Sequence, residues 1–147
     1  MIEKASKTKG TVTGIPTGFI DLDYKLSGLQ RSDLILVAAR PSMGKTAFVL
    51  NIAQHVAFRQ EKAVAIFSLE MSKEQLVNRL FSLEAHVDAQ ILRTGNLKDS
   101  DWEKLIEGAG TIGKSKLIID DTSGISITEM RSKCRKYKLE HGLDLII

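Results

Sequence analysis

The sequence predicts an α/β fold with a largely parallel sheet, and two observations carry this prediction. Short, nearly continuous apolar runs recur along the 147 residues, as in strands that are covered on both faces. Segments with apolar residues at helical spacing separate these runs, and three of them open with a capping box, at residues 72–75, 100–103 and 126–129. Strands that alternate with helices in this way are typical of βαβ units.

The expected strands cover residues 33–38, 63–67, 116–120 and 143–147. The expected helices follow at 44–59, from 72, from 100 and at 126–140, with Trp102, Leu105, Ile106 and Ala109 forming the buried stripe of the third. Residues 1–13 are polar and lysine-rich, so we expect a linker remnant there and a domain over 14–147. Because no covering helix follows the fourth strand, we expect this domain to be truncated after it.

Composition excludes several classes of protein. The apolar content of 43% and charged content of 27% are those of an ordinary soluble globular domain. No apolar run reaches the ~20 residues that span a bilayer, and no secretory signal opens the chain. A single cysteine, Cys134, excludes an internal disulfide framework. We therefore expect no membrane association and a cytoplasmic location. The net charge of +3 fits either a polyanionic partner or a solvated surface.

A phosphate-binding loop stands between the first expected strand and the helix after it. Its residues are Ala39-Arg40-Pro41-Ser42-Met43-Gly44-Lys45-Thr46, which match the Walker A pattern in the strand–loop–helix context that this motif requires. Backbone N–H groups from Ser42 to Thr46 can surround a β-phosphate at the positive end of a helix. The loop therefore predicts binding of a nucleoside triphosphate with Mg²⁺.

Individual positions in the loop have separate roles. Lys45 supplies a positive charge to the β- and γ-phosphates, and the Thr46 hydroxyl can coordinate Mg²⁺. Gly44 lets the backbone approach the phosphate without a Cβ in the way. Ala39 replaces the first glycine of the pattern, so the turn must form without positive φ there. Pro41 fixes its own φ, which stiffens the loop.

ATP hydrolysis also needs carboxylates that orient water and hold the metal. Glu70 follows the second strand and is the best candidate for positioning the attacking water; the alternative is a polar residue that opens a loop. Asp120 and Asp121 follow the third strand and match a Walker B pattern, but the same residues also fit a turn. The strand at 143–147 is a rival Walker B strand whose acid would be residue 148.

Other candidates favour structural roles. The basic residues of the 126–140 helix fit a solvated face or a subunit contact better than a phosphate backbone. Cys134 lies on the apolar stripe of that helix. The three histidines lack the spacing of metal ligands.

Five blocks, in this order, resemble the bacterial replicative DNA helicases of the DnaB type. They are GIPTGF at 14–19, LILVAARPSMGKT at 34–46, IFSLEMS at 66–72, LRTG at 92–95 and IIDDT at 118–122. The resemblance implies a RecA-like motor domain that binds ATP and Mg²⁺ at a subunit interface. Its parent would form a homo-hexamer around single-stranded DNA at the fork, with a primase and a helicase loader as partners. Ala39 is acceptable in that family.

The same resemblance implies site residues. Lys45 and Thr46 would bind triphosphate and Mg²⁺, and Glu70 would be the catalytic glutamate. The Walker B aspartate would be residue 148, so Asp120 and Asp121 lose that role. Two readings stay open beside the helicase motor: a nucleotide-binding or partner-docking module without catalysis, and, more weakly, a P-loop small-molecule kinase.

Overall fold

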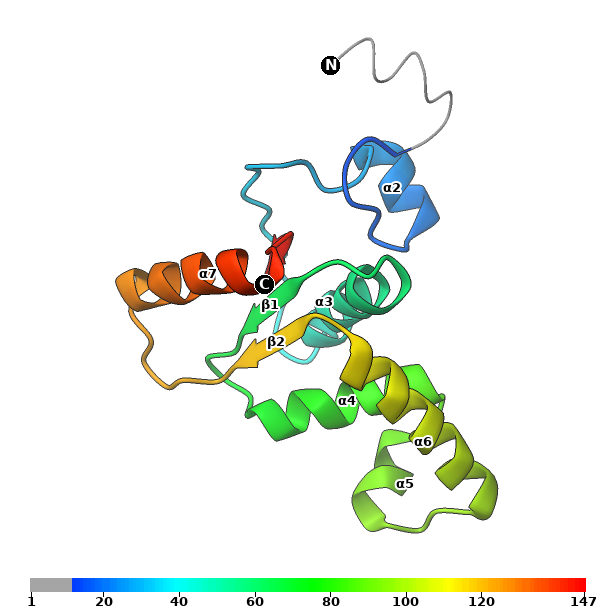
Figure 1. Ribbon diagram of the computed structural model, residues 1–147. Coiled ribbons are helices and arrows are strands. Elements are labelled where there is room, and N and C mark those ends of the chain that lie inside the picture. The colour runs from blue at the N-terminus through cyan, green and yellow to red at the C-terminus, as the bar shows by residue number, and fades with distance from the viewer. Residues whose placement is uncertain (1–11) are drawn as a thin grey trace. The chain divides into compact units, whose positions relative to one another are not determined.

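The computed structural model describes residues 12–147, so the predicted linker remnant falls almost wholly outside the described residues. The chain divides into two compact units, one ending at Val56 and the other covering Ala57–Ile147. The first contains helices α2 (Ile20–Leu26) and α3 (Lys45–Gln54), and the π-helix η1 (His55–Arg59) continues α3 across the boundary. Figure 1 labels α2 and α3. The prediction of a helix over 44–59 is confirmed in extent, with a change of helix type in its last turn.

A buried carboxylate organises the start of the first unit. Asp23 is 7% exposed, and its side chain accepts hydrogen bonds from the Thr17 N–H (2.7 Å), the Thr17 hydroxyl (2.7 Å) and the Gly18 N–H (3.2 Å). The Thr17 hydroxyl oxygen in turn accepts from the Phe19 N–H at 3.2 Å, just before α2. These bonds satisfy both the buried Asp23 carboxylate and the N–H and O–H groups that donate to it, as a buried charge requires. Residues 17–23 therefore form one hydrogen-bonded corner.

The prediction of a buried strand at residues 33–38 is wrong. These residues form no strand, and Leu34 and Leu36 are 90% and 87% exposed. An extended run becomes a strand only by hydrogen bonding to a neighbour, and the sheet of the described residues has the order β2-β1-β3, without this run. Apolar composition indicated a tendency to be buried but not which partner would cover it.

The second unit is built on a parallel sheet of β1 (Val64–Phe67), β2 (Leu117–Asp120) and β3 (Leu145–Ile146). β1 is the central strand, with Val64 level with Leu117 on one side and Leu145 on the other. Its residues Val64, Ala65 and Ile66 are at most 5% exposed. The other three predicted strands are thus confirmed, and the predicted parallel sheet is observed with three strands in place of four.

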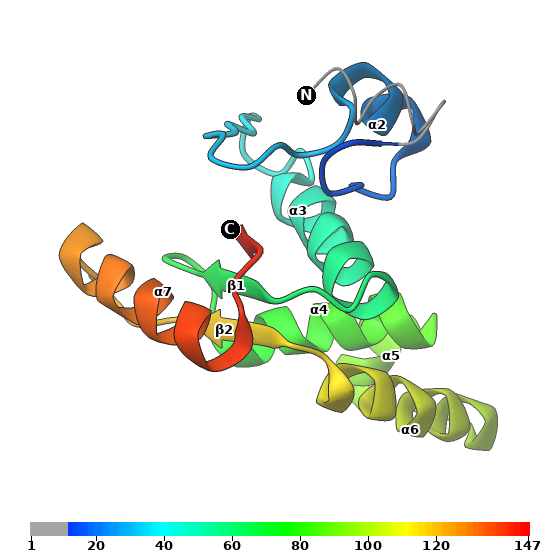
Figure 2. The same ribbon diagram turned by 45° about the horizontal axis from the view of Figure 1, so that its top comes forward.

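Four helices complete the second unit: α4 (Lys73–Ala85), α5 (Ala89–Thr94), α6 (Asp99–Lys114) and α7 (Ile127–His141). α4 packs against α5 and α6, which lie beside it in Figures 1 and 2. The connection from β1 to β2 leads toward one edge of the sheet, whereas the connection from β2 to β3 leads toward the opposite edge. Right-handed crossovers therefore place α4 and α7 on opposite faces, as Figure 1 shows.

Two of the three predicted capping boxes mark helix starts correctly. The Ser72 side chain accepts from the Gln75 N–H and the Gln75 side chain accepts from the Ser72 N–H, which completes the box at α4. The Ser126 hydroxyl accepts from the Glu129 N–H at 3.1 Å, which caps α7. Each such cap contributes about 1 kcal/mol. Both helices therefore begin where the local sequence fixes them.

The prediction for the third capped helix is wrong in two respects. α6 starts two residues earlier than expected, with Lys98 at the N-cap and the Asp101 carboxylate accepting from the Lys98 N–H at 3.0 Å. The predicted stripe is also misplaced, because Trp102 is 54% and Ile106 71% exposed while Gly108 is buried. A Cβ on Gly108 would lie 3.5 Å from the Ala85 Cβ, so the small residue, rather than the indole, sets the face that approaches α4.

No helix in residues 12–147 is long and apolar enough to cross a membrane.

Candidate nucleotide-binding site

The phosphate loop at residues 39–46 leads directly into α3, whose first residue is Lys45. Residues 39–45 are exposed and Thr46 is half-buried. Within the loop, a hydrogen bond from the Met43 N–H to the Arg40 carbonyl, at 3.3 Å, closes a turn. The loop–helix part of the predicted context is therefore observed, whereas the preceding strand is not.

The turn is made by two residues with positive φ, Ser42 (63°) and Gly44 (85°). Ala39 and Pro41 are not among the positive-φ residues, as expected for a loop that lacks the first glycine. A Cβ on Gly44 would meet nothing within 4 Å inside the chain. Glycine is therefore required here by the left-handed backbone conformation, in addition to the close approach to a phosphate that the sequence suggested.

The start of α3 presents free donors. The Gly44 carbonyl accepts from the Phe48 N–H at 2.9 Å, which begins the helix. The first turn contains no acidic residue, and Gly44 provides no side-chain cap. The N–H groups of Lys45, Thr46 and Ala47 thus lack intrahelical acceptors at the positive end of the helix dipole. Within the described chain, Lys45 forms no ion pair. This arrangement fits a polyphosphate anion.

Glu70 belongs to the other compact unit, three residues after β1 ends and three before α4 begins. It is exposed. The Ser68 N–H donates to the Asp120 carbonyl at 2.9 Å, and the Ser68 hydroxyl accepts from the Met71 N–H at 3.1 Å. The side chain therefore stands on a short turn at the carboxyl end of the central strand, where the sequence placed it.

Asp120 and Asp121 both have partners within the fold. Asp120 is 2.7 Å from the Lys133 Nζ and also accepts from the Thr122 N–H at 2.9 Å. The Lys133 hydrogen bond, together with those from Thr122, lowers the pKa of Asp120 from 3.8 to about 2. Asp121 accepts from the Lys73 N–H at 2.7 Å. Through these bonds the two acids anchor the end of β2 to α7 and to the start of α4. Residues 12–147 contain no cluster of three or more potential metal-ligating His, Cys, Asp or Glu side chains.

Sequence reasoning missed the role of Lys133, which it treated as one of several basic residues on a solvated helix. Lys133 also approaches Glu129, one turn earlier on α7, at 3.7 Å. The remaining basic residues of the helix are exposed as expected, and Lys136 pairs loosely with Glu140 at 3.9 Å. Cys134 is half-buried, which raises the pKa of its thiol. The available signal for this ion pair was an Asp at a strand end followed by a Lys in the second turn of the next helix.

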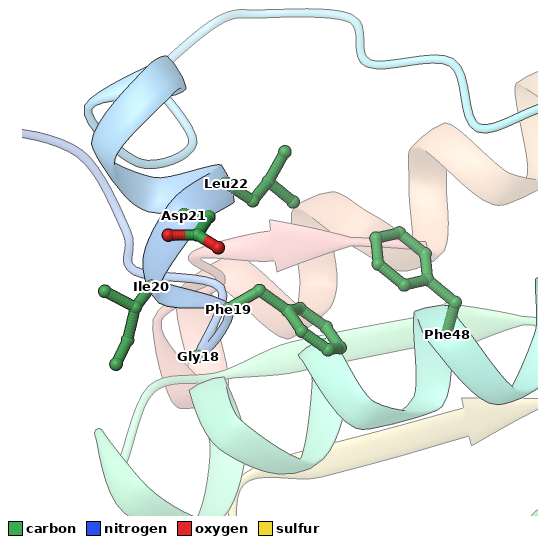
Figure 3. Close-up of a pocket in the computed structure, with 6 residues that line it drawn as sticks. All are labelled: Gly18, Phe19, Ile20, Asp21, Leu22 and Phe48. Carbon is green, nitrogen blue, oxygen red and sulfur yellow. The ribbon is translucent and has the colours of Figure 1, made fainter.

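A shallow apolar hollow lies in the first unit, with a volume of about 530 Å³. Figure 3 shows its lining, in which Phe19 from the start of α2 faces Phe48 from α3. The two rings stack with centroids 5.1 Å apart and planes at 24°. This contact packs the 14–19 block against the helix that carries Lys45 and Thr46.

Comparison with known proteins identifies the architecture. Residues 14–147 match the family described as DnaB-like helicase C terminal domain. The chain is 56% identical over 146 residues to the replicative DNA helicase DnaC of Bacillus subtilis and 53% identical to the replicative DNA helicase DnaB of Geobacillus stearothermophilus. The matches take in 99% of this chain and 32% of each relative, so the chain spans about a third of the curated relatives that it matches.

Solved structures agree. An ATPase domain of known structure superposes with a TM-score of 0.91 at 34% identity, over 99% of this chain and 52% of that one. A DnaB-like replicative helicase, solved in a study of its interactions with primase, gives 0.90 at 34% identity over 99% and 35%. The predicted RecA-like α/β fold and the resemblance noted from the sequence are both confirmed, and the chain belongs to the family of DnaB-like helicase C-terminal domains.

Proposed function

We propose that residues 14–147 are the amino-terminal, ATP-binding part of the motor domain of a replicative DNA helicase, which couples ATP hydrolysis to unwinding of duplex DNA. The observation that carries the proposal is the start of α3. Three N–H donors, a left-handed Gly44 and Lys45 meet there; the first turn of α3 contains no acidic residue, and Lys45 forms no ion pair within residues 12–147. That donor set suits a triphosphate, and the names of the relatives support the helicase assignment.

In this proposal Lys45 neutralises the β- and γ-phosphates, while N–H groups of residues 42–46 bind their oxygens. The Thr46 hydroxyl is the ligand that this loop would offer to Mg²⁺, whose charge would polarise the γ-phosphate. Ala39, Arg40, Pro41 and Met43 shape the loop. Glu70 would accept a hydrogen bond from the attacking water and orient it toward phosphorus.

The wider assembly is part of the same proposal. The intact helicase would be a cytoplasmic homo-hexamer that encloses single-stranded DNA, with a primase and a helicase loader as partners. One structural relative is described by its interactions with primase, which supports the first of these partners. The resemblance assigns the Walker B carboxylate, on the metal side of the site, to residue 148, and we expect residues 14–147 to bind ATP.

The experiment is calorimetric titration of the chain with ATP·Mg²⁺. We expect Lys45→Ala to weaken binding by about tenfold or more, equivalent to ~1.4 kcal/mol. Lys104→Ala removes an equal charge from an exposed site on α6 and should leave the affinity unchanged. Equal affinities for wild type and Lys45→Ala would refute the phosphate-binding role.

Catalysis itself can be tested in a relative. Residues 14–147 would replace the matching segment of the Geobacillus stearothermophilus helicase, and ATP turnover would be compared with and without Glu70→Gln. We expect the substitution to lower kcat by roughly a hundredfold or more while ATP affinity is retained. Unchanged turnover would show that Glu70 does not position the water. ATP binding without any turnover in the unsubstituted chimera would favour a non-catalytic nucleotide-binding module.

A further inference from the structure

The turn that carries Glu70 is only five residues long, from Ser68 to Ser72, and its two ends have different attachments. At the first end, the Ser68 N–H donates to the Asp120 carbonyl at 2.9 Å and continues the β1–β2 pairing by one bond. Across the turn, the Ser68 hydroxyl accepts from the Met71 N–H at 3.1 Å. Of these two bonds, only the first attaches the turn to the sheet, at its start, because the second joins two residues of the turn itself.

The exit is fixed by a side chain 48 residues away. The Asp121 Oδ2 accepts from the Lys73 N–H at 2.7 Å. Lys73 is the first residue of α4, so its N–H has no acceptor within the helix. A carboxylate at this position also interacts favourably with the positive end of the helix dipole. Asp121 therefore binds the start of α4 to the end of β2.

Local capping does not explain this bond. The Ser72 hydroxyl already accepts from the Gln75 N–H, and the Gln75 side chain accepts from the Ser72 N–H. That capping box defines where α4 begins, but its two members are only three residues apart in sequence. It places no restraint on the position of α4 relative to the sheet. The Asp121 bond does, because its acceptor belongs to the β2 end and its donor to the helix.

Asp120 holds the acceptor in place from the other side. Its carboxylate accepts from the Lys133 Nζ on α7 at 2.7 Å and from the Thr122 N–H at 2.9 Å, so the two residues that flank Asp121 in the chain are bonded to each other. The Asp120 backbone carbonyl is the same group that receives the Ser68 N–H. Adjacent residues at one strand end thus attach both ends of the Glu70 turn.

We infer that Asp121 is a positioning residue that fixes the turn carrying Glu70, an inference that rests on the hydrolytic role proposed for Glu70. Asp121 is exposed and lies outside the phosphate loop, and it acts through the Lys73 amide rather than on substrate. Because displacement of a catalytic group by about 1 Å can cost as much as a hundredfold in rate, release of one end of so short a turn should slow hydrolysis more than it weakens ATP binding.

The first test measures the turn in this chain by amide exchange and ¹H–¹⁵N spectra. Asp121→Ala should raise the exchange rate of the Lys73 amide by about tenfold or more and shift or broaden the signals of Leu69, Glu70 and Met71. The Phe67 amide, which donates to the Ile147 carbonyl in the sheet, should be unaffected. Asp121→Asn keeps a carbonyl acceptor and should restore most of the protection.

The matched control is Asp88→Ala. Asp88 caps α5 by accepting from the Gln90 N–H at 2.6 Å, so this variant loses an equivalent bond at a different helix and should leave the turn unchanged. Wild-type exchange at Lys73 in Asp121→Ala would overturn the inference. Equal acceleration of the Lys73 and Phe67 amides would also overturn it, because that result indicates a general loss of stability.

The second test uses the chimeric helicase described above. Asp121→Ala should lower kcat roughly tenfold to a hundredfold and leave KM for ATP within about twofold, with recovery in Asp121→Asn. If Glu70→Gln abolishes turnover and Asp121→Ala does not slow it, the positioning role is wrong and the proposed function stands. If Glu70→Gln leaves turnover intact, the proposed role of Glu70 fails whatever Asp121→Ala does.

Discussion

Replacing Asp120 with asparagine should make the stability of the second unit less dependent on pH. Asp120 is the acceptor of the 2.7 Å bond from Lys133, and the two side chains are 11% and 29% exposed. The substitution keeps the size of the side chain but removes the charge that Lys133 and Thr122 stabilise. The pKa of Asp120, lowered from 3.8 to about 2, gives the size of the effect.

A shift from 3.8 to about 2 corresponds to about 2.5 kcal/mol of differential stabilisation of the carboxylate. Solvent reaches the ammonium group and screens the pair, so we retain about half, ~1 kcal/mol. The folded-state pKa lies below the unfolded value, so this contribution is fully present above pH 4. It is lost as the pH falls toward 2 and the carboxylate becomes protonated in both states.

Urea denaturation of wild type and Asp120→Asn provides the measurement. The free energy of unfolding should differ by about 1 kcal/mol at pH 7, and the difference should shrink steadily below pH 4. Asp33→Asn, at an exposed site outside any helix or strand, should change stability by less than ~0.5 kcal/mol at every pH. A ¹³C titration that places the Asp120 carboxyl at its ordinary pKa, or equal stabilities at pH 7, would refute the reasoning.

Three further variants test other parts of the structure. In Gly44→Ala the alanine must adopt φ near 85°, which costs a residue with a Cβ about 1–2 kcal/mol, so calorimetry should show ATP binding weakened about tenfold. The control Gly110→Ala, in open space on α6, should bind ATP normally. Asp23→Ala leaves the buried donors of the 17–18 turn without an acceptor and should lower the free energy of unfolding by about 2–4 kcal/mol; a loss under ~0.5 kcal/mol in urea would contradict the buried network. Ser72→Ala removes one half of the α4 capping box and should cost ~1 kcal/mol, seen as a lower thermal midpoint; an unchanged midpoint would show that Gln75 and Asp121 suffice.

The sequence determined the features that depend on neighbouring residues. The caps at Ser72 and Ser126, the central β1 strand and the loop that leads into α3 follow from short-range hydrogen bonding and from apolar runs. The family blocks added the fold and the order of elements. These features could be predicted because each is encoded within a few adjacent positions.

The tertiary structure decided everything that depends on a distant partner. Residues 34–38 are apolar yet exposed, since composition does not specify a neighbouring strand. The face of α6 is set by Gly108 against Ala85 rather than by Trp102. Asp120 and Asp121 match a metal-site pattern in sequence, but in the structure Asp120 pairs with Lys133 and Asp121 accepts from the Lys73 N–H. Their partners lie 13 and 48 residues away, and only folding brings those groups within hydrogen-bonding distance.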